Sequence, residues 1–204
     1  MAISYDQRQE VIALLVGMFD AAPNADILEE FVTSLEDGST VSQIANDLDD
    51  HELFLDIYPN WFTNEDVAGA LAAALVDGNG DASVEAAAEA ALLSILEGGA
   101  SVGDTIHAAT AFLMTADALA DANFGDVAQA FQNKVDVATY VAINALNADS
   151  DMETLTAALD GVDATADSVT DQKAKINNGE LTADAEQFLT VNQDFIEGTS
   201  GDDY

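Results

Sequence analysis

The chain has 204 residues, no cysteine, and a net charge of −35 from 39 acidic and 4 basic residues. Such a charge repels nucleic-acid phosphates and anionic membranes, so we expect no nucleic-acid partner, and the charge must be neutralised by salt, by divalent cations or by a cationic partner. The lack of cysteine excludes disulfides, thiol nucleophiles and zinc sites with cysteine ligands.

Helical periodicity dominates the chain, and only two prolines interrupt it. The first predicted helix, for example, carries one apolar stripe of Val11, Leu14, Leu15 and Met18. The predicted helices span 5–19, 25–37, 41–48 running on into 50–58, 63–76, 83–97, 101–120, 125–147, 152–160 and 164–177. We therefore expect an all-α fold, a multi-helix bundle with a short β-strand tail at the C-terminus.

Polar residues mark the helix ends. Thr63 followed by Asp66 predicts a capping box with Asp in place of Glu, and Ser101 is expected to cap the helix that follows it. Along 101–120 we expect an inward face made of Ile106, Ala109, Phe112, Leu113, Ala116 and Leu119. We expect residues 1–185 to form the helical domain. Pro59 breaks the helical pattern, so this domain can consist of two sub-bundles, about 1–60 and 61–185.

The acidic charge is not typical of a disordered chain, because 49% of the residues are hydrophobic. A folded and very acidic protein indicates a saline or calcium-rich setting, so we expect Ca²⁺ as a cofactor. No basic segment followed by an apolar run opens the chain, and no long apolar span predicts a transmembrane helix. The residues alone thus indicate a cytoplasmic protein or export by a route other than Sec.

In the loop after the predicted helix 63–76, every second residue has a side-chain oxygen, as in an EF-hand: Asp77, Asn79, Asp81, Ser83 and Glu85. We assign Asp77, Asn79, Asp81 and Ser83 as candidate Ca²⁺ ligands. The match is imperfect, because Ala82 stands where an EF-hand has glycine. The alternative is a helix–helix turn in which Asp81 or Ser83 is the N-cap.

The last residues, FLTVNQDFIEGTSGDDY, predict two short strands at 188–191 and 194–197 followed by glycine turns. Gly201 and Asp203 match the G-G-x-G-x-D pattern of a calcium β-roll, and Ser200 departs from it. We assign 186–204 as the start of such a roll or a linker. Asp202 and Asp203 are candidate Ca²⁺ ligands, provided that a following repeat supplies the other carboxylates. A disordered acidic tail is the alternative.

Three runs together resemble secreted RTX and S-layer-like proteins: LLVGMFDAAPNADILEEFVTSLEDGSTVSQIANDLDDHELF, FQNKVDVATYVA and FLTVNQDFIEGTSGDD. The first is similar to the domain near the N-termini of those proteins, the second to their N-K-x-x-V-A segment, and the third to the junction where their β-roll begins. The chain departs from the family in the first turn motif, where Asp20-Ala-Ala-Pro23 stands in place of the usual arginine. This departure puts in doubt any ligand that the arginine reads.

The resemblance implies the N-terminal helical domain of a type-I-secreted protein located at the cell surface, in an S-layer or an extracellular matrix. It also implies a homo-oligomer or lattice, with cell-surface polysaccharide or lipopolysaccharide as a further partner. We expect a structural module that uses Ca²⁺ and is not an enzyme. The alternatives are the N-terminal module of an RTX adhesin or of a secreted RTX hydrolase.

Few other residues carry chemistry. No hydrolase, zinc-protease or P-loop motif surrounds His51 or His107, so we expect both to be surface or boundary residues. Lys134 is expected to pair with Asp136 or with a neighbouring helix, and anionic sugar binding is its alternative. Trp61 follows a proline turn, which favours a core plug over a platform for sugar stacking.

Overall fold

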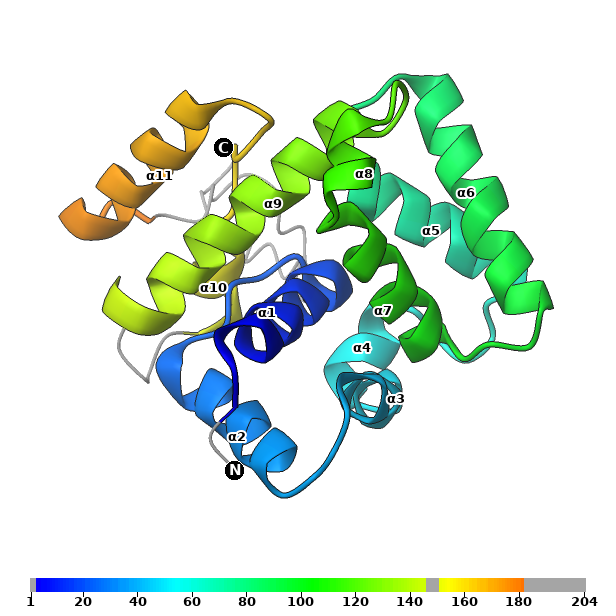
Figure 1. Cartoon of the computed structure of the whole chain (residues 1–204), viewed down its shortest axis with the longest axis horizontal. Coiled ribbons are helices and arrows are strands. Elements are labelled where there is room, and N and C mark those ends of the chain that lie inside the picture. The colour runs from blue at the N-terminus through cyan, green and yellow to red at the C-terminus, as the bar shows by residue number, and fades with distance from the viewer. Residues whose placement is uncertain (1–2, 146–150, 182–204) are drawn as a thin grey trace, which may run out of the picture.

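A computed structural model describes residues 3–145 and 151–181, and in these ranges the chain is all-α with no strand (Figure 1). The all-α prediction is therefore confirmed for the described residues, whereas the predicted strands at 188–191 and 194–197 lie outside them. The elements are α1 (Tyr5–Phe19), α2 (Ala25–Glu36), α3 (Val41–Asp49), α4 (Glu52–Ile57), α5 (Asn64–Val76), α6 (Ala82–Glu97), α7 (Val102–Leu113), α8 (Ala116–Ala120), α9 (Gly125–Tyr140), the π-helix η1 (Val141–Ala145), α10 (Met152–Ala157) and α11 (Ala166–Asn178).

Side chains next to the helices set their starts and stops. Thr63 and Asp66 form the predicted capping box of α5, in which each side chain bonds the backbone of the other residue. Ser101 accepts a hydrogen bond from the Asp104 N–H at 2.9 Å and caps α7, as predicted. At the far end of the chain, α11 stops at Gly179, which adopts φ 67.

Three predicted helices are divided in the structure, and in one of them, 125–147, the α-helix α9 ends at Tyr140 and the π-helix η1 follows. The expected continuation of 41–48 into 50–58 is interrupted, because His51 caps the separate helix α4. The expected helix 101–120 breaks near Met114, because Thr115 accepts a hydrogen bond from the Ala118 N–H and caps α8. Three residues of the predicted inward face are exposed, so that part of the prediction is wrong: Phe112 at 43% just before the break, and Ala116 and Leu119, the latter at 38%, after it.

Helix α1 occupies the centre of the molecule (Figure 1). Residues 11–18 are all buried, and the helix packs against α2, α3, α7 and α9. The sequence predicted a single apolar stripe, but the surrounding helices cover every side. This explains why VIALLVGM contains no charged residue, since a helix that is buried all round has no polar face.

Helix α7 crosses α1 and α3 at two glycines. A Cβ on Gly17 would overlap with the Thr110 side chain, and a Cβ on Gly103 would overlap with the Ala45 carbonyl. Both positions are in helices, so the glycines serve close approach and not an unusual backbone angle. The absence of a side chain lets the three helices approach closely enough to bury their small residues.

Polar bonds between α3 and α7 fix the same crossing. The Ser42 hydroxyl donates to Asp104 Oδ1 at 2.6 Å, and the Asn46 amide donates to the same oxygen at 3.2 Å. The hydrogen bond from Ser42 is the main reason why the pKa of Asp104 is lowered. Burial raises the pKa of nearby Asp49, whose carboxylate accepts a hydrogen bond from the Gly103 N–H at 3.1 Å.

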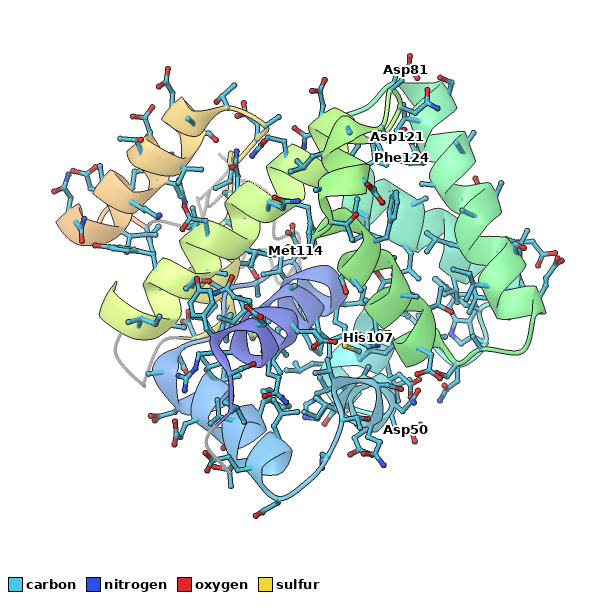
Figure 2. All side chains as sticks on the ribbon, viewed as in Figure 1. Asp50, Asp81, His107, Met114, Asp121 and Phe124 are labelled. Atoms are coloured by element: carbon cyan, nitrogen blue, oxygen red, sulfur yellow. The ribbon has the colours of Figure 1, made fainter. Side chains whose placement is uncertain are left out.

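One cluster of buried residues extends from α1 through α11 and includes side chains from both predicted sub-bundles. Charged side chains project away from this core, as the carboxylate oxygens around the ribbon show (Figure 2). Among the described residues, no helix has the length and apolar character that crossing a membrane requires.

We predict that Gly103→Ala lowers the free energy of unfolding by about 1–3 kcal/mol, because the new methyl group pushes α7 away from the α3 backbone. The matched control is Gly69→Ala, also inside a helix, where the added Cβ has its nearest neighbour, the Glu89 carboxylate carbon, at 3.9 Å. This control is expected to gain up to about 1 kcal/mol from helix propensity. Urea unfolding measures the stability of the two variants. Equal changes in their free energies of unfolding would contradict the close approach of α7 to α3.

Candidate functional site

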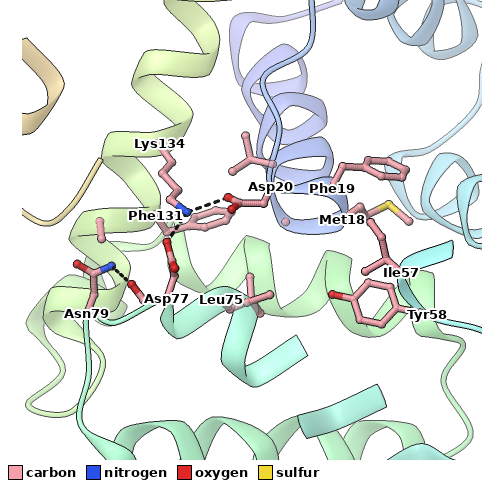
Figure 3. A pocket seen from close by; sticks show the side chains of 14 residues that line it. Met18, Phe19, Asp20, Ile57, Tyr58, Leu75, Asp77, Asn79, Phe131 and Lys134 are labelled. Atoms are coloured by element: carbon pink, nitrogen blue, oxygen red, sulfur yellow. Dashed lines mark hydrogen bonds and ion pairs between the residues drawn. The ribbon is translucent and has the colours of Figure 1, made fainter. Parts of the chain in front are cut away.

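Lys134, in the middle of α9, is the only buried lysine or arginine among the described residues. Its side chain is 8% exposed, and its Nζ lies 2.8 Å from Asp20 Oδ1 and 2.7 Å from Asp77 Oδ2. Both carboxylates are about half exposed, so the cluster is closed on the lysine side and open to water on the other (Figure 3). We call Lys134, Asp20 and Asp77 the lysine cluster.

Both aspartates stand at the C-terminal ends of helices. Asp20 follows α1 and Asp77 follows α5, and they adopt φ 46 and φ 41. They are the only non-glycine residues with positive φ in the described part of the chain. Glycine would adopt this conformation with less strain, although aspartate tolerates it better than most residues. The shared ion pair gives the physical reason for aspartate at both positions.

The lysine cluster also places a positive charge at the negative ends of two helix dipoles. The last turns of α1 and α5 contain no basic residue, although a cation stabilises the negative end of a helix. The Lys134 ammonium reaches the end of both helices from α9. One cation thus pairs with two carboxylates at two helix ends and offsets one of their two negative charges.

A cavity of about 100 Å³ lies beside the lysine cluster, and Tyr58 and Asn79 are among its lining residues (Figure 3). This volume is below the roughly 300 Å³ of a typical small-molecule site. Burial, and then the charge of Asp20, raise the pKa of Tyr58 to about 12. The phenol therefore stays neutral at physiological pH and forms part of a wall.

The two aspartates keep the Lys134 ammonium protonated. Burial alone would lower its pKa, but Asp20 and Asp77 raise it, so the net shift is upward. A lysine that acts as a base or a nucleophile needs the opposite shift, toward the neutral amine. The geometry therefore supports an electrostatic role for Lys134, which joins α1, α5 and α9.

The predicted Ca²⁺ ligands in the 77–83 loop take part in other bonds. Asp77 pairs with Lys134, and the Asn79 side-chain amide donates to the Asp77 carbonyl at 3.0 Å. Asp81 Oδ1 accepts hydrogen bonds from the Ser83 N–H at 2.8 Å, the Ser83 hydroxyl and the Val84 N–H, which makes it the N-cap of α6.

These are the bonds of a helix–helix turn, and the Ca²⁺ assignment of the loop stays a prediction. The described residues contain no group of three or more His, Cys, Asp or Glu that could hold a metal ion. Hydrogen bonds from Ser83 lower the pKa of Asp81, as expected for a capping carboxylate. The other two candidate ligands, Asp202 and Asp203, lie outside the described residues, and their assignment stays a prediction.

The remaining candidates are distributed over the surface. His51 Nδ1 accepts a hydrogen bond from the Leu53 N–H at 3.2 Å, and His107 Nε2 lies 2.8 Å from Glu10 Oε1. Trp61 is 77% exposed, so the expected core plug is wrong at this residue. Tyr58 takes the buried position on the other side of the proline.

The expectation that Lys134 pairs with a neighbouring helix is confirmed, whereas Asp136 pairs with Lys173 at 2.8 Å instead. Sequence reasoning did not single out Asp20. The available signal was an aspartate directly after an apolar helix, at a C-cap where glycine is usual.

Family models, curated proteins and solved structures were all compared with the chain, and none of them matches it. The resemblance to secreted RTX and S-layer-like proteins therefore rests on the three quoted runs of residues. Evidence for function comes from the charge, the lysine cluster and the surface of this chain.

We predict that the double variant Asp20→Asn/Asp77→Asn is less stable than the wild type by about 1–3 kcal/mol. Asparagine tolerates the positive φ values, so the change isolates the loss of charge around a buried ammonium. Lys134→Met replaces the ammonium with an apolar side chain of similar length and is expected to cost less than about 1 kcal/mol.

Lys173→Met is the matched surface control for these variants, because Lys173 has one carboxylate partner and is 26% exposed. Its effect should stay below about 0.5 kcal/mol. Urea unfolding ranks the variants. We expect the double aspartate variant to lose more stability than Lys134→Met, because it leaves a buried ammonium without a partner. A larger loss for Lys134→Met would contradict this explanation.

We also predict a loss of stability at alkaline pH. Lys134 has a folded pKa above 10.5, and Tyr58 has a folded pKa of about 12 against 10.0, so both favour the folded protein while protonated. Their contributions are complete below about pH 10 and decrease as the pH rises through the folded values. Between pH 9 and 12, the melting temperature of Tyr58→Phe should fall less steeply with pH than that of the wild type. An unchanged dependence on pH would show that Tyr58 does not contribute.

Proposed function

We propose that this chain is a non-catalytic helical module of a secreted surface-layer or extracellular matrix protein of the RTX type. In this role it assembles with neighbouring subunits, or attaches to anionic cell-surface polysaccharide, through divalent cations such as Ca²⁺. The resemblance supports the family, and the charge on the folded body supports the dependence on cations.

The observation that carries the proposal is the excess of unpaired carboxylates on a folded helical body. The lysine ion pairs of the described residues engage only Asp20, Asp77 and Asp136. Acidic pairs such as Glu29 and Glu30 are exposed on α2, without an ion pair to lysine or arginine. Two such bodies repel each other, and so do one body and an anionic polymer.

A divalent cation bridges like-charged surfaces because it binds oxygen ligands from both. Ca²⁺ accepts six to eight oxygens in flexible geometry, whereas Mg²⁺ prefers to keep much of its water. Monovalent salt only screens the repulsion. The proposal thus distinguishes Ca²⁺ from Mg²⁺ and from NaCl of equal ionic strength.

We predict that millimolar Ca²⁺ raises the weight-average sedimentation coefficient of the chain, or makes it co-sediment with purified lipopolysaccharide. NaCl of equal ionic strength should do neither, and Mg²⁺ should be weaker because it sheds water reluctantly. If Ca²⁺ and NaCl give the same result in both assays, the chain does not assemble through divalent cations, and the proposal is refuted.

The variant Asp81→Asn separates the loop from the rest of the acidic surface. Asparagine caps a helix as well as aspartate, so α6 keeps its N-cap while the loop loses a charged ligand. Ca²⁺-dependent assembly that persists in this variant assigns the effect to the wider acidic surface. Assembly that disappears assigns it to the 77–83 loop, in agreement with the sequence prediction.

A further inference from the structure

An apolar groove of about 310 Å³ lies between α6 and α7, and Leu75 is the one residue that it shares with the cavity beside the lysine cluster. Its lining residues come from α5, α6, α7 and the start of α9, and every one of them is apolar. Figure 2 labels Phe124 between α8 and α6, where its ring meets Phe112 edge-to-face with centroids 6.2 Å apart. The groove is therefore a surface feature with its own geometry.

The groove is open because α6 is partnered mainly on one side. Helix α6 packs chiefly against α5, and of its 16 residues only Leu92 and Leu96 are buried. Ile95 on α6 and Phe112 on α7 border the groove and are 36% and 43% exposed. Both side chains therefore leave apolar surface at the edge of the groove in contact with solvent.

The walls have room for a helix. Ala88 and Ala91 face the groove from α6, and Ala108 and Ala109 face it from α7. Small side chains on both walls allow another helix to approach to the usual 8–10 Å between axes. An incoming helix would complete a four-helix arrangement with α5, α6 and α7.

Charge determines which kind of helix fits. No lysine or arginine of the described residues lines the groove, and the exposed Asp126 adjoins the lining residue Val127 in the sequence. Asp121 lies at the Phe124 end, where it accepts a hydrogen bond from the Phe124 N–H at 3.0 Å. A second copy of the chain would bring another net charge of −35, whereas a cationic helix is complementary.

We propose that the groove between α6 and α7 binds a cationic amphipathic helix of a partner protein, with its apolar stripe against Phe112 and Ile95. This surface is distinct from the cation-dependent assembly proposed above and does not depend on it. The mode is that of an amphipathic helix laid into an apolar groove, with anchors at i, i+3, i+4 and i+7.

The test uses the full chain in EDTA and a fluorescein-labelled synthetic peptide of leucine and lysine, with leucines at helical spacing. A scrambled peptide of the same composition has the same charge but no apolar stripe. By fluorescence anisotropy, we expect the striped peptide to bind at least about tenfold more tightly than the scrambled one. Phe112→Glu should weaken the striped peptide by at least about tenfold.

Trp61→Glu is the matched control, because it adds the same negative charge to an exposed aromatic residue that lines neither the groove nor the cavity beside the lysine cluster. Its affinity should stay within about twofold of the wild type, since only bulk charge changes. If Phe112→Glu loses its helical circular dichroism, Ala91→Glu repeats the test. Ala91 is exposed and lies on the opposite wall of the groove, so glutamate there should also weaken binding of the striped peptide.

Three outcomes would overturn the proposal. Equal binding of the two peptides would mean attraction by bulk charge alone. Unchanged binding in the folded groove variants would place the peptide elsewhere on the chain. Self-association of the wild type in EDTA that Phe112→Glu abolishes would assign the groove to a second copy.

Discussion

The scarcity of cations in a chain with a net charge of −35 is the constraint on which the rest of the structure depends. Folding brings acidic residues together, so the few positive charges must act where they neutralise most. Lys134 does so, because its ammonium contacts Asp20 and Asp77 at the ends of two helices. The acids are also useful at helix starts, where Asp66 and Asp81 bond backbone N–H groups.

The apolar half of α1 opposes the repulsion of the surface. Residues 11–18 are buried on every side, and the glycine contacts at Gly17 and Gly103 let α7 lie close to both α1 and α3. The core combines large side chains such as Phe54, Ile12 and Leu14 with buried alanines, and the two glycines let the helices that carry them approach closely. Helix α6 packs mainly against α5 and buries only Leu92 and Leu96, so a groove stays open between it and α7.

The molecule therefore separates its tasks in space. The lysine cluster joins α1, α5 and α9 by electrostatics, the outer carboxylates face solvent, and the groove offers an apolar surface. Turn and capping bonds account for Asp77 and Asp81, so those residues contribute to helix geometry whether or not Ca²⁺ binds. Because the groove and the acidic surface differ in chemistry, their partners can be tested one at a time.

By itself, the sequence determined the all-α class, most helix boundaries and the caps at Thr63 and Ser101, because these depend on contacts within about four residues. It also predicted that Lys134 pairs with a neighbouring helix. Only the tertiary structure decided that its partners are Asp20 and Asp77, which lie 114 and 57 residues away. The exposure of Trp61 and Phe112 was likewise decided by which helices came to lie beside them, since a local apolar pattern does not specify its cover.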